Sequence, residues 1–133
     1  MKKTLALLAL FLVFACAKKD NGEALVNEVL NIHDEVMPKI GEVMALRKKV
    51  LDKVEGSTNP DELRDIAKSL EEAQQGMMLW MNDWSKNSAP FVNNEKTQEE
   101  KMDYLNAEKQ RVTKVKDDIE KAIKEGKAAI NKN

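Results

Sequence analysis

Apolar residues recur along most of the chain at alternating steps of three and four, a spacing that places side chains on one face of an α-helix. The pattern predicts three amphipathic helices, over residues 23–54, 60–85 and 98–130. The first apolar stripe consists of Val26, Val29, His33, Val36, Ile40, Val43, Arg47, Val50 and Val54, widened by Leu30, Met37, Met44 and Leu51. The second consists of Leu63, Ile66, Leu70, Ala73, Met77, Trp80, Met81 and Trp84. The third consists of Met102, Leu105, Val112, Val115, Ile119, Ala122, Ile123 and Ile130.

Several residues mark where these helices begin or bend. Pro38 lies inside the first helix and removes one backbone hydrogen bond, so a kink is expected there. Asn59 followed by Pro60 is typical of an N-cap and a first helical position. Thr97 and Glu100 have the spacing of a capping box at the start of the third helix.

Other residues indicate where the apolar stripes are interrupted or where a predicted helix ends. Lys109 interrupts the third stripe, as Arg47 does the first, and both side chains are expected to reach outward to solvent. Gly126 is expected to mark a fraying helix end, with residues 127–133 trailing into disorder. The connection before the third helix contains Phe91 and Val92, which we expect to fold back over the bundle end rather than to enter a membrane interface.

Three amphipathic helices with short connections favour one architecture. They pack up, down and up around a shared interior, which gives an elongated, coiled-coil-like antiparallel three-helix bundle. The sequence therefore predicts an all-α fold with a single domain over residues 23–131.

The first residues have the pattern of an export signal. Lys2 and Lys3 form a short basic region, and residues 4–15 are mostly apolar. This apolar segment is a dozen residues long, whereas a helix needs roughly 20 residues to span a bilayer. We therefore interpret residues 1–15 as a signal peptide rather than a membrane anchor.

The signal ends in the residues Val13-Phe14-Ala15-Cys16, which resemble the bacterial lipobox. The resemblance implies lipidation of Cys16, cleavage before it, and acylation of the new amino terminus by a fatty acid such as palmitate. Cys16 is the chain's single cysteine, so an internal disulfide is excluded. Ala17 follows it where a sorting rule for such lipoproteins expects Asp for retention, which favours the outer membrane. Residues 16–22 would then be the lipidated end and a short tether.

Composition and charge narrow the functional classes. The chain has 22 basic and 23 acidic residues, and removal of Lys2 and Lys3 leaves 20 against 23, a net charge of about −3. Without a net positive field to attract phosphates, nucleic acid is not expected as a partner.

An antiparallel arrangement of the first two helices gathers most of the chemically distinctive side chains at the end near the tether. The cluster expected there consists of His33, Met37, Met77, Met78, Trp80, Met81, Trp84, Met102 and Tyr104.

The thioether and imidazole groups of His33, Met37, Met77, Met78 and Met81 suit a soft metal such as Cu(I) or a haem iron. Methionines also fill irregular gaps in cores, and here they surround two indoles, Trp80 and Trp84. The core interpretation needs no cofactor, and we favour it.

Enzymatic chemistry is not expected. His33 is the only histidine, and with Cys16 lipidated no Cys–His pair remains. The sequence contains no nucleophile elbow, no HExxH zinc motif and no glycine-rich phosphate loop. A di-iron bundle requires two Glu-x-x-His motifs, and the residue three before His33 is Leu30.

Two segments resemble a known group of proteins. His33-Asp34-Glu35-Val36-Met37-Pro38-Lys39-Ile40 and Met77-Met78-Leu79-Trp80-Met81 are similar to the HDEVMPKM-like and MMDWM-like motifs of small uncharacterised lipoproteins of the Bacteroidota type. Some of these proteins are labelled as similar to viral A-type inclusion proteins. Ile40 and Leu79 depart from the family pattern. The resemblance implies an envelope lipoprotein with a helical fold and carries over no activity.

Together these features predict a lipid-anchored protein of the cell envelope. Its expected role is structural or protein-binding, through an envelope partner or through self-association, and the alternative is a bundle that binds a soft metal or haem.

Overall fold

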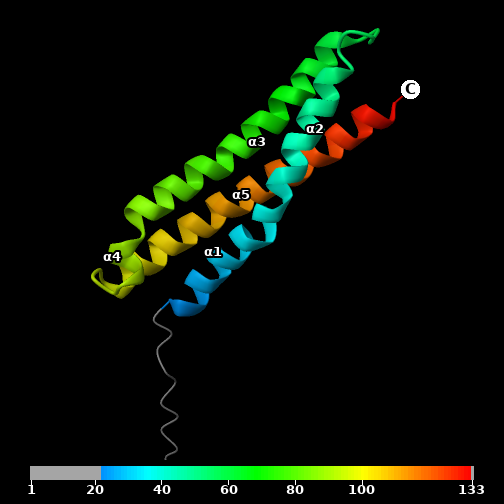
Figure 1. Cartoon of the computed structure of the whole chain (residues 1–133). Coiled ribbons are helices and arrows are strands. Elements are labelled where there is room, and N and C mark those ends of the chain that lie inside the picture. Colours follow the sequence, from blue (N-terminus) through cyan, green and yellow to red (C-terminus); the bar gives the residue numbers. More distant parts are fainter. Residues whose placement is uncertain (1–21, 133) are drawn as a thin grey trace, which may run out of the picture.

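The computed structural model describes residues 22–132, and these residues form an elongated, all-α bundle (Figure 1). Within this range the chain contains helices and connections but no β-strand, which confirms the predicted fold class. The helical elements are α1 (Glu23–Val36), η1 (Met37–Lys39), α2 (Ile40–Asp52), α3 (Pro60–Asn87), α4 (Ala89–Val92) and α5 (Gln98–Asn131). The predicted signal peptide and the lipidation site at Cys16 lie outside the described residues.

The first predicted helix is divided at Pro38. The residues Met37–Lys39 form a single 3₁₀ turn between α1 and α2, because proline cannot donate the backbone hydrogen bond that a continuous α-helix requires there. The interruption confirms the predicted kink. The three elements otherwise continue one another as a single long rod, which we call the α1–α2 rod (Figure 1).

The core of the bundle is built from one side of each rod. Along the α1–α2 rod, a column of valines is completely buried, consisting of Val29, Val36, Val43 and Val50. Leu70 and Met77 from α3 and Leu105, Val112 and Ile119 from α5 have no exposed surface either. β-Branched valines pack as compact, rigid side chains against the larger residues of the two other helices.

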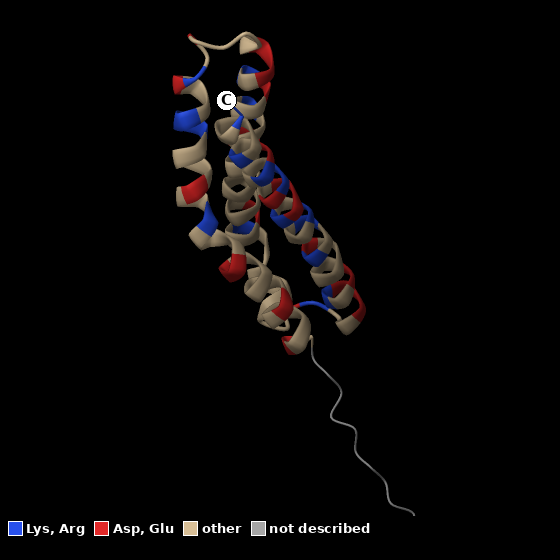
Figure 2. Cartoon of the chain, turned by 90° about the vertical axis from the view of Figure 1, so that its right-hand side faces the viewer, with Lys and Arg blue, Asp and Glu red and all other residues tan. Residues whose placement is uncertain are grey.

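The α1–α2 rod and α5 run in the same direction, and charged pairs show their alignment. Glu35 pairs with Lys116 at 2.7 Å, and Lys39 pairs with Glu120 at 2.6 Å, each pair 81 residues apart in sequence. Glu28 and Lys109 form a further pair with the same separation. Figure 2 shows positive and negative residues interspersed along the helices. Exposed ion pairs of this kind add little stability. Their common separation of 81 residues shows how the α1–α2 rod is aligned with α5.

The C-terminal end of α5 stays helical, whereas the sequence predicts that it frays. The helix continues to Asn131, and Gly126 is buried within it, so the predicted fraying from Gly126 onward is wrong. A Cβ on Gly126 would lie 3.2 Å from Leu70 Cδ1 and 3.5 Å from Leu46, so the glycine allows the three rods to approach closely. Lys53 Nζ donates to the carbonyl oxygens of Ile130 at 2.7 Å and Lys132 at 2.8 Å, which satisfies the terminal carbonyls of α5.

Candidate functional site

The end of the bundle near Gly22 contains a row of five aromatic rings from α1, α3, α4 and α5. His33 lies 5.7 Å from Trp80, Trp80 lies 5.6 Å from Trp84, and Trp84 lies 6.2 Å from Tyr104, measured between ring centroids. Tyr104 in turn stacks on Phe91 at 4.0 Å with nearly parallel planes. We call these five residues the aromatic cluster. The predicted gathering of His33, Trp80, Trp84 and Tyr104 is therefore confirmed.

Phe91 joins the cluster because the connection between α3 and α5 folds back on the bundle. Residues Ala89–Val92 form the short helix α4, and the Phe91 N–H donates to the Ser88 carbonyl oxygen at 3.0 Å. This turn places the Phe91 ring against Tyr104 rather than outward. The expectation that this segment covers the bundle end is confirmed.

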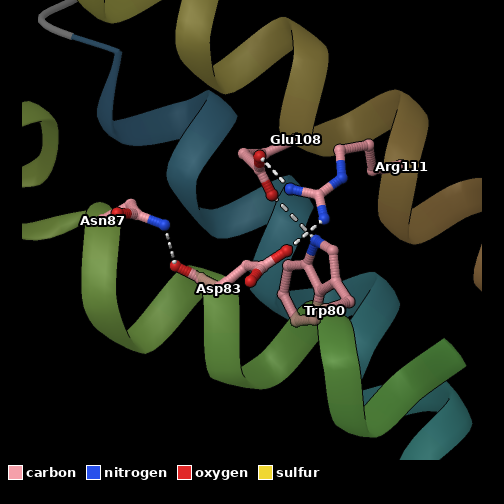
Figure 3. A network of polar contacts seen from close by, with 5 residues as sticks. All are labelled: Trp80, Asp83, Asn87, Glu108 and Arg111. Atoms are coloured by element: carbon pink, nitrogen blue, oxygen red, sulfur yellow. Dashed lines mark hydrogen bonds and ion pairs between the residues drawn. The ribbon is translucent and has the colours of Figure 1, made fainter. Parts of the chain in front are cut away.

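A polar network begins at the indole of Trp80, one ring of the aromatic cluster (Figure 3). Trp80 Nε1 donates to Glu108 Oε2 at 2.9 Å, and Arg111 Nη1 donates to Glu108 Oε1 at 2.8 Å. Arg111 Nη2 also donates to Asp83 Oδ2 at 2.7 Å, which links α5 to α3. Glu108 is 5% exposed, and both of its carboxylate oxygens have a donor. A buried carboxylate requires such partners, since an unpaired charge in the interior is strongly unfavourable.

The network and the aromatic cluster alter each other's acid–base behaviour. Hydrogen bonds to Asp83 and Glu108 raise the pKa of the Arg111 guanidinium, which stays charged. Burial, together with the negative charge of Glu108, raises the pKa of the Tyr104 hydroxyl to about 12. Tyr104 is therefore neutral and Arg111 positive near neutral pH.

The sequence interpretation missed Glu108, and it placed the interruption of the third stripe at the wrong residue. Glu108 lies three residues after Leu105 and four before Val112, so it occupies a position of the apolar stripe. Lys109 is next to it and pairs at the surface with Glu28. The spacing alone indicates that Glu108 is buried, and a buried charged residue must have a partner. Lys101, 2% exposed and hydrogen-bonded to Asn94, is a second example.

The methionines proposed as metal ligands are distributed over different surroundings. Met77 is completely buried, while its neighbour Met78 is 41% exposed, so the two side chains point to different sides of α3. Met37 and Met81 are partly buried and pack against the core. Met102 lies beside Gly22, at the start of α1, rather than in the row of rings.

His33 has contacts that account for its position without a metal. Its ring packs against Trp80, and its Nδ1 lies 2.9 Å from Asp34 Oδ1. Within residues 22–132, no group of three or more His, Cys, Asp or Glu side chains is arranged to hold a metal ion. The ring that the structure places against His33 is that of Trp80, and the soft-metal interpretation of the methionines stays a prediction.

Large apolar side chains are exposed at Met78 (41%) and Leu79 (64%) of α3 and also along one side of the α1–α2 rod. Leu30 is 36% exposed, Met44 is 46% exposed and Leu51 is 38% exposed, and Met37 lies at the same seven-residue spacing with partial burial. We call these four residues the outer column. The sequence predicts that they widen the buried stripe, and for Leu30, Met44 and Leu51 this is wrong, because none of the helices within residues 22–132 covers them.

Comparison with protein-family models, with curated proteins and with solved structures finds no match to the chain. Over the described residues, the helices are not both long enough and apolar enough for any of them to cross a bilayer.

Proposed function

We propose that this chain is a lipid-anchored lipoprotein of the cell envelope that acts as a non-enzymatic, protein-binding helical module. The observation that carries the proposal is the outer column. Leu30, Met44 and Leu51 are 36–46% exposed on one side of a rod whose valine column is completely buried, and Met37 lies at the same seven-residue spacing with partial burial. Helical partners recognise rows of apolar side chains at this spacing.

The proposed anchor rests on the sequence around Cys16. A lipobox-like motif after a basic and apolar leader supports attachment through acyl chains, and more than one chain makes such attachment stable. Gly22, the first described residue, lies beside Met102 and Leu105 at the aromatic end. The short tether would therefore place this end nearest to the membrane surface.

The aromatic cluster supports a structural role better than a catalytic or metal-binding one. The polar atoms of Trp80, Glu108 and Arg111 are paired with one another, so the network stabilises the bundle end. No observation favours the soft-metal or haem alternative, because Met77 and Met78 diverge and His33 has other contacts.

Cross-linking in intact cells tests the binding function. The outer variant, Met44→Lys with Leu51→Lys, places two charges in the outer column. The control variant, Asn106→Lys with Gln110→Lys, adds the same charges at exposed positions of α5. We expect a cross-linked adduct in the parent and in the control that is lost in the outer variant, with all three equally folded. An adduct that persists in the outer variant would contradict the proposal.

Fractionation tests the anchor separately. The parent chain should sediment with membranes and incorporate labelled fatty acid, and Cys16→Ala should abolish both. Membrane association and labelling that survive this substitution would exclude lipidation of Cys16.

A further inference from the structure

We propose that the partner of the outer column is a second copy of this chain, packed antiparallel against it about a two-fold axis close to Gly41. This inference rests on the proposed protein-binding function and identifies its partner. It follows from the order of residues on the outward face of the α1–α2 rod.

That face is symmetric in character about Gly41. Reading along the rod, its residues are Leu30, Asp34, Met37, Gly41, Met44, Lys48 and Leu51. The two leucines lie 11 and 10 residues from Gly41, the two charged residues lie seven residues from it on either side, and the two methionines lie four and three residues from it. All are at spacings that keep side chains on one side of a helix.

An antiparallel copy converts this symmetry into complementary contacts. A two-fold axis near Gly41 places Leu30 opposite Leu51 of the other copy and Met37 opposite Met44. The same axis places Asp34 opposite Lys48, so each interface contains two pairs of opposite charge. A parallel arrangement would instead place Asp34 beside Asp34 and Lys48 beside Lys48. Because a dimer contact with two-fold symmetry must be self-complementary, the charges select the antiparallel arrangement.

The centre of the face is open to close approach. A Cβ on Gly41 would meet nothing within 4 Å, and the residue is exposed. Glycine at the crossing point of two helices lets their backbones approach, which increases the contact made by the flanking methionines.

Met78 adds apolar surface from α3 at the same level. Arg47 of α2 pairs with Glu71 of α3 at 2.8 Å, which fixes the alignment of these antiparallel helices. Met78 lies seven residues after Glu71, and Ile40 lies seven before Arg47, so Met78 is level with the centre of the symmetric face. Its side chain is 41% exposed.

The charged residues are available for the new contacts. Asp34 and Lys48 have side chains that are 73% and 78% exposed, and their present partners are near neighbours, His33 and Asp52. Exposed pairs of this kind are weak, so the side chains can turn to the other copy at little cost.

The arrangement has a consequence for the membrane. Gly22 lies 19 residues from Gly41, about 28 Å along a helix, so the two tethers would leave the dimer about 57 Å apart at opposite ends. Both anchors reach one bilayer only if the dimer lies along its surface. The two-fold axis would then be perpendicular to the membrane.

Charge reversal tests the antiparallel pairing in the purified, lipidated full-length chain. The dissociation constant of the dimer would be measured in detergent from the dependence of mass on protein concentration. Asp34→Lys and Lys48→Asp should each weaken the dimer about tenfold or more, since each creates two like-charge contacts. The combined variant restores both pairs and should return to within about threefold of the parent. A parent that stays monomeric, or a combined variant as weak as the single ones, would overturn the proposal.

Disulfide formation tests the position of the axis. Gly41→Cys should give a covalent dimer on mild oxidation, because position 41 faces itself across the axis. Gly56→Cys is the matched control, since a Cβ there also meets nothing within 4 Å, and it should remain monomeric. Linkage at position 56 and not at position 41 would place the contact elsewhere.

The mass of the adduct in cells separates this inference from the proposed function. An adduct of twice the chain mass that is lost in the outer variant supports both. An adduct with a different protein, also lost in the outer variant, retains the binding function and overturns the second copy as partner.

Discussion

Two columns of apolar residues run along the same rod and differ in position by a single residue. The inner column, Val29, Val36, Val43 and Val50, is completely buried. The outer column, Leu30, Met37, Met44 and Leu51, begins one residue later; Leu30, Met44 and Leu51 are 36–46% exposed and Met37 is partly buried. Both repeat every seven residues, so hydrophobic periodicity alone does not distinguish a core from a surface.

The difference comes from helix geometry and from the number of helices in the bundle. Each residue turns the side-chain direction by about 100°, so the outer column faces well away from the inner one. The inner column is covered by α3 and α5, and within the described chain no further helix covers the outer column. A second helical rod would complete the packing, which is the geometry that we propose for a second copy.

The largest expected effect is a contrast between adjacent residues. Val43→Asp would bury a carboxylate with no partner and should prevent folding or cost several kcal/mol, on the order of 4. Met44→Asp places the same group at a position that is 46% exposed and should change the free energy of unfolding by less than about 0.5 kcal/mol. Denaturant unfolding followed by circular dichroism measures both. Equal losses would show that the two columns do not differ as described.

A smaller loss of stability is expected when the cation that pairs with the buried Glu108 carboxylate is removed. Arg111→Ala leaves the Glu108 carboxylate buried without its cation; because the Arg111 side chain is 47% exposed, we expect a loss of about 2 kcal/mol, as for a hydrogen bond to a charged group. Arg64→Ala is the matched control, because Arg64 also pairs with an acidic residue three positions earlier, Asp61, which is 89% exposed. The control should lose less than about 1 kcal/mol. If both variants lose the same amount, burial of Glu108 has no energetic consequence.

The smallest effect concerns Tyr104, whose side chain is partly buried. Tyr104 is the only tyrosine, so phenolate absorbance reports its ionisation alone. Its pKa should be about 12 in the folded chain and near the ordinary value of 10.0 in denaturant. The stability that neutral Tyr104 contributes is therefore complete below pH 10 and is lost as the pH rises through about 12. In Tyr104→Phe this part of the alkaline loss should be absent. A folded titration at the denatured value would contradict burial of the hydroxyl.

Much of the fold was predictable because local signals agreed with one another. Pro38, the Asn59–Pro60 pair and the Thr97 capping box locate the interruption and the helix starts, and the structure has them at these residues. Gly126 was misinterpreted because glycine is a weak helix former in isolation. Its role depends on Leu46 and Leu70, which are distant in sequence and come close only in the folded chain.

The candidate site was predictable to a lesser degree. The aromatic cluster follows from antiparallel register, which the connection lengths constrain. The polar network follows only in part, because the stripe position of Glu108 indicates burial but does not identify Trp80 and Arg111 as its donors. The outer column was assigned to the buried stripe, since a sequence gives the period of a pattern but not the number of helices available to cover it.

The most direct test of the outer column uses the chain's own methionines. Limited oxidation, followed by peptide mass analysis, would be applied to intact envelopes and to the purified chain diluted to the monomer. Met44 and Met78 should be oxidised rapidly in the diluted chain and be protected in the envelope, while the buried Met77 should be protected in both. Equal oxidation of Met44 in both settings would show that nothing covers this part of the outer column, and would contradict the proposed binding function.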